Sequence, residues 1–264
     1  MTMLIDKQKV ANSFSRAAGT YDSVAELQRD IGNKLIDFLP KSVPQRVLDL
    51  GCGTGYFSSK LNSTYPGASL LNLDLALGML RFAREHRSVE QAHWICGDAE
   101  ALPLVNDSID VIFSSLAIQW CEDLPALFNE ILRVLSPGGY FVFATLGPDT
   151  LKELRQAWQQ ADSFTHVNRF LSLEQHLSAL PESLVVEEIQ EEERVLRYRQ
   201  LKELTDELKQ LGAHNMNAGQ QTGLTGRERV KRFKAAYEQQ RLVDGAIPAT
   251  YQVFYAVLHK PLEE

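Results

Sequence analysis

Three acidic residues stand at the ends of successive apolar runs, and a glycine-rich turn follows the first of them. Asp49 lies within residues 47–55 (VLDLGCGTG), Asp74 ends the next run, and Asp98 ends the third. If these runs are parallel strands, their carboxyl ends meet at one edge of a sheet, where carboxylates can accept from ammonium, hydroxyl and amine groups. One such carboxylate alone is equally typical of a helix cap. The three together predict a nucleoside ligand.

The turn after Asp49 contains Gly51, Gly53 and Gly55. Glycine permits a sharp bend and lets the backbone approach a ligand closely, where a Cβ would collide. The spacing is G-x-G-x-G, whereas dinucleotide-binding proteins use G-x-G-x-x-G, so a pyrophosphate cradle is disfavoured. We therefore expect Asp49 to accept from an ammonium group instead.

The elements that must position these residues alternate along the chain from Arg46 onward. Short β-rich runs occupy residues 46–50, 69–74, 93–96, 109–115 and 140–146. Amphipathic stretches occupy residues 56–63, 76–86 and 124–135, and a helix stop and turn is predicted at 136–139 (SPGG). This alternation predicts an α/β fold, with a mostly parallel sheet covered by helices on both faces.

The flanks of this core are predicted to cover the site. Residues 7–39 carry an apolar stripe typical of one or two helices, which form a lid. The stretches after the core are predicted as helices at 150–162, 173–180, 201–211 and 227–240, and as strands at 184–198 and 249–259. We expect a single domain over residues 1–264. Its parts are the lid (1–45), the cofactor-binding core (46–148), a helical insertion (149–182) and a C-terminal part that faces substrate and partner (183–264).

Bulk properties exclude several classes of protein. No window approaches the ~18 apolar residues of a membrane helix, and no targeting segment is recognised, so a cytoplasmic protein is expected. The three cysteines, Cys52, Cys96 and Cys121, lack C-x-x-C spacing, which favours reduced thiols. The histidines are scattered, so no metal is expected.

The charge is distributed unevenly. The chain carries a net charge of −7, yet residues 194–241 contain 11 basic and five acidic residues, an excess of +6. This stretch, the basic segment, can steer an anionic partner. Solvated faces of amphipathic helices explain the same charges equally well.

The motif over residues 47–55, with the acidic residues that follow it, resembles the class I S-adenosylmethionine-dependent methyltransferases across residues 47–146. The resemblance implies a seven-stranded Rossmann-like fold that converts S-adenosylmethionine to S-adenosylhomocysteine. It assigns the methionine part of the cofactor to Asp49 and the turn, the ribose to Asp74, and the adenine to Asp98. The full cofactor set is Asp49, Gly51, Cys52, Gly53, Gly55, Asp74, Leu75, Asp98, Ala99, Ser115 and Leu116.

Motifs in the flanks of the core and directly after its fourth strand are similar to those of malonyl-acyl carrier protein O-methyltransferases, which act at the start of biotin synthesis. They are residues 14–18 (FSRAA), Tyr21-Asp22, Gln28, 115–121 (SLAIQWC), 166–170 (HVNRF), 208–215, 224–227 (LTGR) and 248–251 (PATY). The Gln-Trp-Cys and His-x-Asn-Arg-Phe elements discriminate best, because broader small-molecule methyltransferases share the N-terminal tyrosine and the glycine turn. The resemblance thus covers nearly the whole chain.

A malonyl carboxylate is ionised at neutral pH, so its methylation requires positioning rather than a general base. Arg169 is expected to orient it, since a guanidinium matches a carboxylate bidentately. Tyr21 supplies a hydroxyl from the lid, Gln119 and Trp120 line the pocket after the fourth strand, and His166 ranks last as a donor. For each residue, packing or a surface ion pair is the alternative.

The resemblance also implies an acidic partner, the acyl carrier protein. We expect it to dock on the basic segment, above all on Arg227, Lys231 and Lys234, whose spacing places them on one helix face. Neither nucleic acid nor membrane is expected as a partner. The alternatives are a methyltransferase for a free small acid of the trans-aconitate type and a non-catalytic nucleoside-binding regulatory module.

Overall fold

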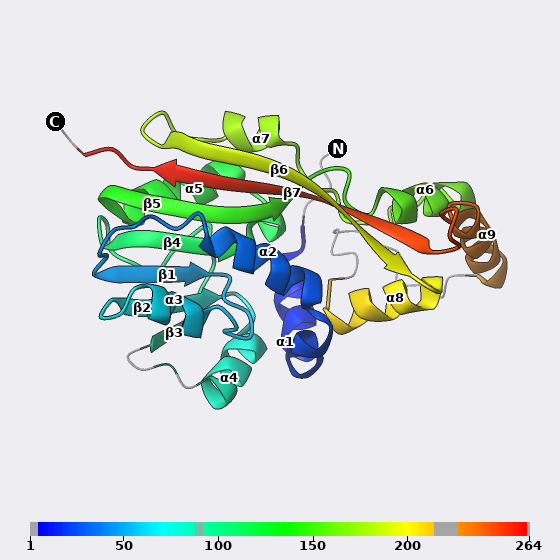
Figure 1. Cartoon of the computed structure of the whole chain (residues 1–264), viewed down its shortest axis with the longest axis horizontal. Helices are drawn as coiled ribbons and strands as arrows, with labels where there is room; N and C mark the ends of the chain where they lie inside the picture. The colour runs from blue at the N-terminus through cyan, green and yellow to red at the C-terminus, as the bar shows by residue number, and fades with distance from the viewer. Residues whose placement is uncertain (1–4, 88, 90–91, 214–225, 263–264) are drawn as a thin grey trace.

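A seven-stranded sheet organises the computed structural model, which describes residues 5–87, 89, 92–213 and 226–262 (Figure 1). The strands are β1 (Arg46–Leu50), β2 (Ser69–Asp74), β3 (Ala92–Cys96), β4 (Ile109–Ser115), β5 (Leu135–Leu146), β6 (Val185–Tyr198) and β7 (Ile247–His259). Their order in the sheet is β3-β2-β1-β4-β5-β7-β6. The first five strands are parallel, and β7 is antiparallel to both of its neighbours. This is the predicted Rossmann-like methyltransferase fold.

Helices cover both faces of the sheet. They are α1 (Lys7–Val24), α2 (Glu26–Ile36), α3 (Ser58–Thr64), α4 (Leu77–His86), η1 (Ile118–Trp120), α5 (Leu124–Val134), α6 (Lys152–Ala161), α7 (Leu173–Ser178), α8 (Leu201–Gln210) and α9 (Arg227–Glu238). Successive strand residues point to opposite faces. Val47, for example, joins the buried cluster that α2 and α3 cover, and Leu48 joins the cluster under α5. Burial on both faces explains why the parallel strands are apolar throughout.

The antiparallel pair β6 and β7 extends past the rest of the sheet. Leu146, the last residue of β5, faces Val253, so residues 247–252 of β7 pair with β6 alone. We call this two-stranded extension, residues 193–198 and 247–252, the overhang. Figure 1 shows α6, α8 and α9 gathered around it, away from the parallel strands. The overhang therefore creates space beyond the edge of the sheet.

The predicted turn at 136–139 is wrong, because these residues lie inside β5. Ile109 of β4 faces Leu135, whereas Val111 faces Tyr140, so the extra residues form a bulge in β5. Gly138 has a φ of 81°, and its amide donates to the Lys260 carbonyl oxygen at 2.8 Å. Pairing on both sides keeps this turn-like sequence in the strand. The short helix η1 was also not predicted.

The first helix of the lid is held between two parts of the chain far from it in sequence. A Cβ on Gly78 of α4 would stand 2.6 Å from the Ser15 carbonyl oxygen, so only glycine allows this approach. On the other side, the Ser13 hydroxyl donates to the Gly212 carbonyl oxygen at 3.0 Å. The predicted lid thus packs directly onto the core and onto the end of α8.

None of the helices that the structure describes is both long and apolar enough to cross a membrane. Four residues of the motifs quoted above lie outside the described residues: His214, Asn215, Leu224 and Thr225. The boundaries of the lid, core, insertion and C-terminal part, like the cytoplasmic location, stay predictions.

Candidate functional site

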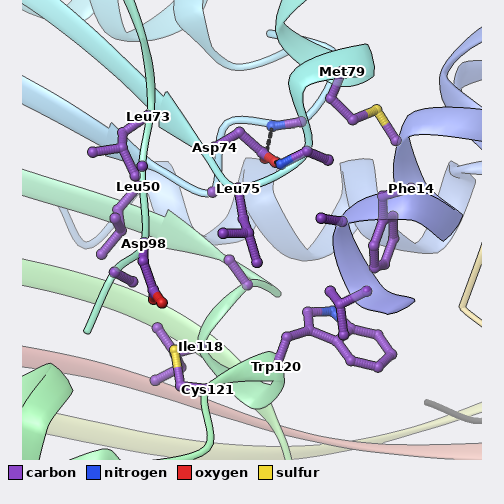
Figure 2. Close-up of a pocket in the computed structure, with 18 of the residues that line it drawn as sticks. Phe14, Leu50, Leu73, Asp74, Leu75, Met79, Asp98, Ile118, Trp120 and Cys121 are labelled. Atoms are coloured by element: carbon purple, nitrogen blue, oxygen red, sulfur yellow. Dashed lines mark hydrogen bonds between the residues drawn. The ribbon is translucent and has the colours of Figure 1, made fainter. Parts of the chain in front are cut away.

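A cavity opens at the carboxyl edge of β1, β2 and β4, beneath α1. Its empty volume, which includes the open space at its mouth, is about 800 Å³. Figure 2 shows Asp74, Leu75 and Asp98 facing it from the sheet, with Phe14 and Trp120 on the opposite side. Predicted cofactor residues that line this first cavity are Gly51, Gly53, Asp74, Leu75, Asp98, Ala99, Ser115 and Leu116.

Asp74 is oriented by backbone amides. Its Oδ2 accepts from the Gly53 amide at 2.8 Å, and its Oδ1 accepts from the Ala76 amide at 2.7 Å. Burial raises the pKa of Asp74, and the two amides oppose that rise. Each carboxylate oxygen has a further lone pair, so the group can still accept from two hydroxyls.

Asp98 is joined to the lid by a lysine that the sequence did not point to. Lys7 of α1 places its Nζ 2.6 Å from Asp98 Oδ2 and 2.6 Å from Glu100 Oε2. The other oxygen of Asp98 accepts from the Glu100 amide at 3.0 Å. Any amine that approaches Asp98 therefore shares this carboxylate with Lys7.

Asp49 lies in a recess beside the first cavity, between the glycine turn and the lid. The recess is lined by Tyr21, Gln28, Arg29, Asp49, Cys52, Thr54 and other residues of the turn. Asp49 is 2% exposed, and its Oδ2 is buried with no hydrogen-bond partner among the described residues. Burial, followed by the charge of Asp74, raises the pKa of Asp49 to about 8. A buried carboxylate of this kind is completed by a cationic ligand.

The glycine turn curves as its spacing predicts. Gly51, Gly53 and Gly55 all have positive φ, at 74°, 54° and 71°. A Cβ on Gly51 would lie 2.2 Å from the Ala117 Cβ. At Gly53 no heavy atom lies within 4 Å of the Cβ position, which opens toward the cavity. A side chain at Gly53 would fill space that a ligand can occupy.

A second cavity begins where the first ends and continues under the overhang. Its volume, again with its mouth, is about 1080 Å³. The two cavities share Phe14, Tyr21, Leu116 and Trp120. Leu116 has a φ of 53°, a strained value for leucine, and Leu151 on the far wall has 54°. Such strain is typical of functional sites.

Tyr21 stands at the junction. It alone among the described residues lines the first cavity, the second cavity and the recess of Asp49. Burial, followed by the charges of Asp74 and Asp22, raises the pKa of Tyr21 above its usual range, so its hydroxyl remains a donor. Tyr21 therefore lies where ligands in the two cavities would meet.

Three other predicted substrate residues line the second cavity. Gln119 donates to the Leu116 carbonyl oxygen at 2.6 Å, which fixes its amide. Trp120 packs edge-on against Phe14 of the lid, with ring centroids 5.3 Å apart. His166 stacks on Trp158, and its Nε2 lies 2.8 Å from Asp162 Oδ1. His166 is therefore partly occupied by a structural contact.

Arg169 does not line the second cavity with the other four predicted substrate residues, Tyr21, Gln119, Trp120 and His166. Its side chain is exposed and lines neither cavity, whereas its neighbours Asn168 and Phe170 both line the second. The segment thus presents its apolar and amide side chains inward and its guanidinium outward. The role predicted for Arg169 in holding a carboxylate stays a prediction.

Lys7, Gln28, Arg29 and Tyr251 line the site without having been assigned to it from the sequence. Gln28 and Tyr251 fell within the quoted family motifs, and this was their only signal. Nothing in the sequence pairs Lys7 with Asp98, because 91 positions separate them. Among the described residues, no three histidine, cysteine or acidic side chains are arranged to hold a metal ion.

Comparison with known proteins agrees with this geometry. A family model described as a methyltransferase domain matches residues 48–143. The malonyl-[acyl-carrier protein] O-methyltransferase of Methylovorus sp. (strain MP688) is 43% identical over 268 residues, covering 98% of this chain and 90% of that protein. This chain belongs to the malonyl-[acyl-carrier protein] O-methyltransferase family. The Serratia marcescens member is 41% identical, with 97% of both chains covered.

Other relatives are longer. The biotin biosynthesis bifunctional protein BioHC of Cellvibrio japonicus is 50% identical over 97% of this chain, but the match covers 51% of its length. This chain spans about half the length of this protein and of two other bifunctional BioHC proteins that it matches.

Solved structures share the fold across different activities. The [4+2]-cyclase SpnF has a TM-score of 0.65 at 17% identity, over 100% of this chain and 99% of its own. The YcgJ protein of Bacillus subtilis has a TM-score of 0.64 at 19% identity, over 89% and 100%. Because a cyclase shares this fold, the fold by itself does not determine the reaction.

Proposed function

We propose that this chain transfers a methyl group from S-adenosylmethionine to the free carboxylate of malonyl-acyl carrier protein, giving the methyl ester that starts biotin synthesis. The observation that carries this proposal is the junction at Tyr21, where the cavity that holds Asp74 and Asp98 opens into a second one. Family membership over nearly the whole chain supports the choice of substrate.

The residues of the first cavity fit S-adenosylmethionine. The unpartnered Asp49 carboxylate suits the ammonium of its methionine part. Asp74, held by two amides, suits the ribose hydroxyls, and Asp98 suits the adenine amine. When bound, the cofactor supplies an electrophilic methyl group on a sulfonium.

Methyl transfer to a carboxylate needs no proton acceptor. One carboxylate oxygen forms a bond to the methyl carbon while the carbon–sulfur bond breaks and its electron pair stays on sulfur. The protein must hold the two reacting atoms near ~3 Å and exclude water, which accounts for roughly 7–11 kcal/mol of a barrier. Tyr21, Leu116 and Trp120 stand at the point where the two cavities join and can do both.

The acyl carrier protein is proposed to dock near α9. Four cations of the basic segment that lie outside α9 are paired with acids: Arg194 with Glu192, Arg197 with Asp244, Lys202 with Asp206 and Arg241 with Glu238. In contrast, Arg227, Lys231 and Lys234 on α9 are exposed and make no ion pair with any described residue. Phe233 of the same helix lines the second cavity. The unpaired positive charge therefore lies on a helix that also forms part of the wall of the second cavity.

A methyl-transfer assay with product mass as the readout tests the proposal. The substrates are malonyl-acyl carrier protein, malonyl-coenzyme A and trans-aconitate. A gain of one methyl on a malonyl thioester, with none on trans-aconitate, is expected. Methylation of trans-aconitate alone would replace the proposed function by that of a free-acid methyltransferase.

A further inference from the structure

Four buried tyrosines surround the overhang, and one of them differs from the rest. They are Tyr198 on β6, Tyr237 on α9, and Tyr251 and Tyr255 on β7. Three of the hydroxyls have protein partners: Tyr198 donates to Glu207 at 3.0 Å, Tyr237 to the Pro248 carbonyl oxygen at 2.9 Å, and Tyr255 to Glu192 at 3.1 Å. The Tyr251 hydroxyl is buried and has no partner among the described residues.

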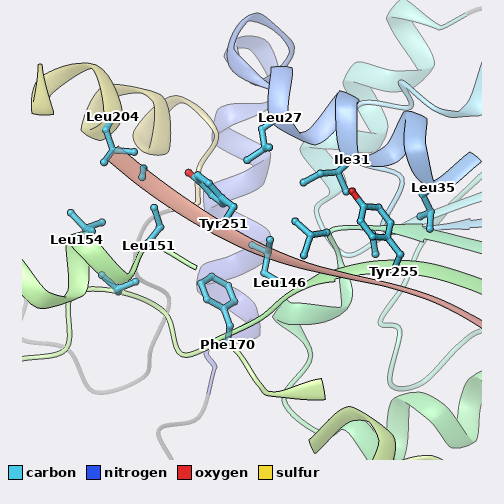
Figure 3. Close-up of a cluster of buried hydrophobic side chains, with 14 of the residues drawn as sticks. Leu27, Ile31, Leu35, Leu146, Leu151, Leu154, Phe170, Leu204, Tyr251 and Tyr255 are labelled. Atoms are coloured by element: carbon cyan, nitrogen blue, oxygen red, sulfur yellow. The ribbon is translucent and has the colours of Figure 1, made fainter. Parts of the chain in front are cut away.

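The same tyrosine faces the second cavity. Tyr251 is 4% exposed and lines that cavity, whereas Tyr198, Tyr237 and Tyr255 do not. Figure 3 shows its ring beside the buried apolar side chains of Leu146 and Leu151. A buried hydroxyl is nearly always hydrogen-bonded, and leaving one unpaired is costly. The missing partner is therefore expected from a ligand.

Gln28 of α2 provides a second buried polar atom without a hydrogen-bond partner among the described residues. Its Oε1 is buried without a hydrogen-bond partner among the described residues, and the residue lines both the second cavity and the recess of Asp49. The structure contains only four such atoms in the part of the chain that it describes, and those of Asp49, Gln28 and Tyr251 all line the site. Rotation of the Gln28 amide presents either its oxygen or its NH₂ group to the same point.

On the basis of the proposed function, we propose that Gln28 and Tyr251 hold the two ends of the malonyl group. The Gln28 amide donates to the free carboxylate, and the Tyr251 hydroxyl donates to the thioester carbonyl oxygen.

The positions of the two residues determine this order. The carboxylate must meet the methyl group near Tyr21, and Gln28 lies on that side because it also lines the recess of Asp49. Tyr251 lines the second cavity alone. In a malonyl thioester the carbonyl is one methylene from the carboxylate, on the side away from the methyl donor. Burial, followed by the charges of Glu207 and Glu153, raises the pKa of Tyr251 above its usual range, which keeps the hydroxyl a donor.

The test compares two substrates on the same carrier protein. One is the malonyl thioester, and the other is its 2-carboxyethyl thioether, in which a methylene replaces the carbonyl and the carboxylate is kept. Tyr251→Phe should lower kcat/KM about tenfold for the thioester, the loss typical of one hydrogen bond, and by less than about twofold for the thioether. Gln28→Met should lower kcat/KM about tenfold for both.

Tyr255→Phe is the matched control, since it removes a buried hydroxyl from the same strand away from both cavities. It should change neither substrate by more than about twofold. Because the Tyr251 hydroxyl has no protein partner among the described residues, Tyr251→Phe should have a Tm equal to or above that of wild type and should keep the wild-type affinity for S-adenosylhomocysteine.

Equal losses on both substrates with Tyr251→Phe, or no loss on either, would overturn the assignment of Tyr251. Unchanged kinetics with Gln28→Met would overturn that of Gln28. If the wild-type protein methylates neither substrate, the proposed function itself fails, and this outcome is distinct because it precedes any variant.

Discussion

The two cavities are built in different ways. The first takes its polar residues from the carboxyl ends of adjacent parallel strands, so its chemistry lies in short segments around Asp49, Asp74 and Asp98. The second takes its walls from α2, η1, the segment around His166, α8, α9 and β7, which span most of the chain. Both surfaces are mostly apolar, but the first presents carboxylates that backbone amides and Lys7 hold in place, whereas the polar groups of the second come from segments far apart in the sequence. This difference suits an enzyme in which the first cavity binds a cofactor that many methyltransferases use and the second binds one particular methyl acceptor.

The largest effect is expected from Asp74→Ala, which tests whether the first cavity serves the cofactor. The substitution removes an acceptor that two backbone amides hold in place and that is proposed to bind the ribose hydroxyls. Hydrogen bonds to a charged group are worth roughly 1.5–3 kcal/mol, so the Kd for S-adenosylhomocysteine should rise about 10- to 150-fold. Calorimetric titration measures this. An unchanged Kd would remove Asp74 from the site.

Asp49→Asn tests whether the recess binds the positively charged ammonium group of the cofactor. The folded pKa of Asp49 is about 8, above the ~3.9 of an unfolded chain, so ionising Asp49 destabilises the ligand-free protein increasingly as pH rises from 4 to 8. The asparagine variant escapes this loss. Its Tm should exceed that of wild type by several degrees at pH 9 and match it near pH 4.

Added S-adenosylhomocysteine should act against this difference in Tm between wild type and Asp49→Asn in the same thermal scans. At pH 8 its ammonium pairs with Asp49, so wild type should gain more Tm from the ligand than Asp49→Asn does. Equal gains in the two proteins would mean that Asp49 does not hold the ammonium.

A triple charge reversal on α9 tests whether the acyl carrier protein docks on this helix, beside the second cavity. With Arg227, Lys231 and Lys234 changed to glutamate, the KM for malonyl-acyl carrier protein should rise severalfold at low salt, while turnover at saturation changes little. Exposed charges act on association and are screened within ~8 Å at physiological salt, so the difference should shrink as salt is added. Malonyl-coenzyme A should be less affected. An equal rise in KM for both thioesters would mean that these charges form only a solvated helix face and do not dock the carrier protein.

The smallest effect is expected from Arg169→Ala. Because the guanidinium is exposed and lines neither cavity, kcat/KM for the malonyl thioester should fall by less than about threefold, the scale of an exposed charge. Cofactor affinity should not change. A loss beyond about tenfold in steady-state assays would show that Arg169 turns inward to hold the carboxylate, as its motif implies.

Local patterns in the sequence were sufficient for the first four strands of the sheet. The strand ends at Leu50, Asp74 and Cys96, the curvature of the glycine turn and the grouping of its carboxylates all follow from short-range rules of pleating, glycine conformation and strand adjacency. Membership in the family followed from motifs spread over the whole chain, because each is readable in place.

Tertiary structure alone decided what lies between distant segments. Lys7 meets Asp98 because the lid folds back on the sheet, and Tyr251 faces a cavity because the overhang carries β7 past the end of β5. The same holds for the bulge in β5, where pairing on both sides overrides a turn sequence. Arg169 shows the converse, since its motif could not reveal which way its side chain faces. Periodicity and spacing describe neighbours along the chain, whereas burial and unpaired atoms depend on which surfaces pack together.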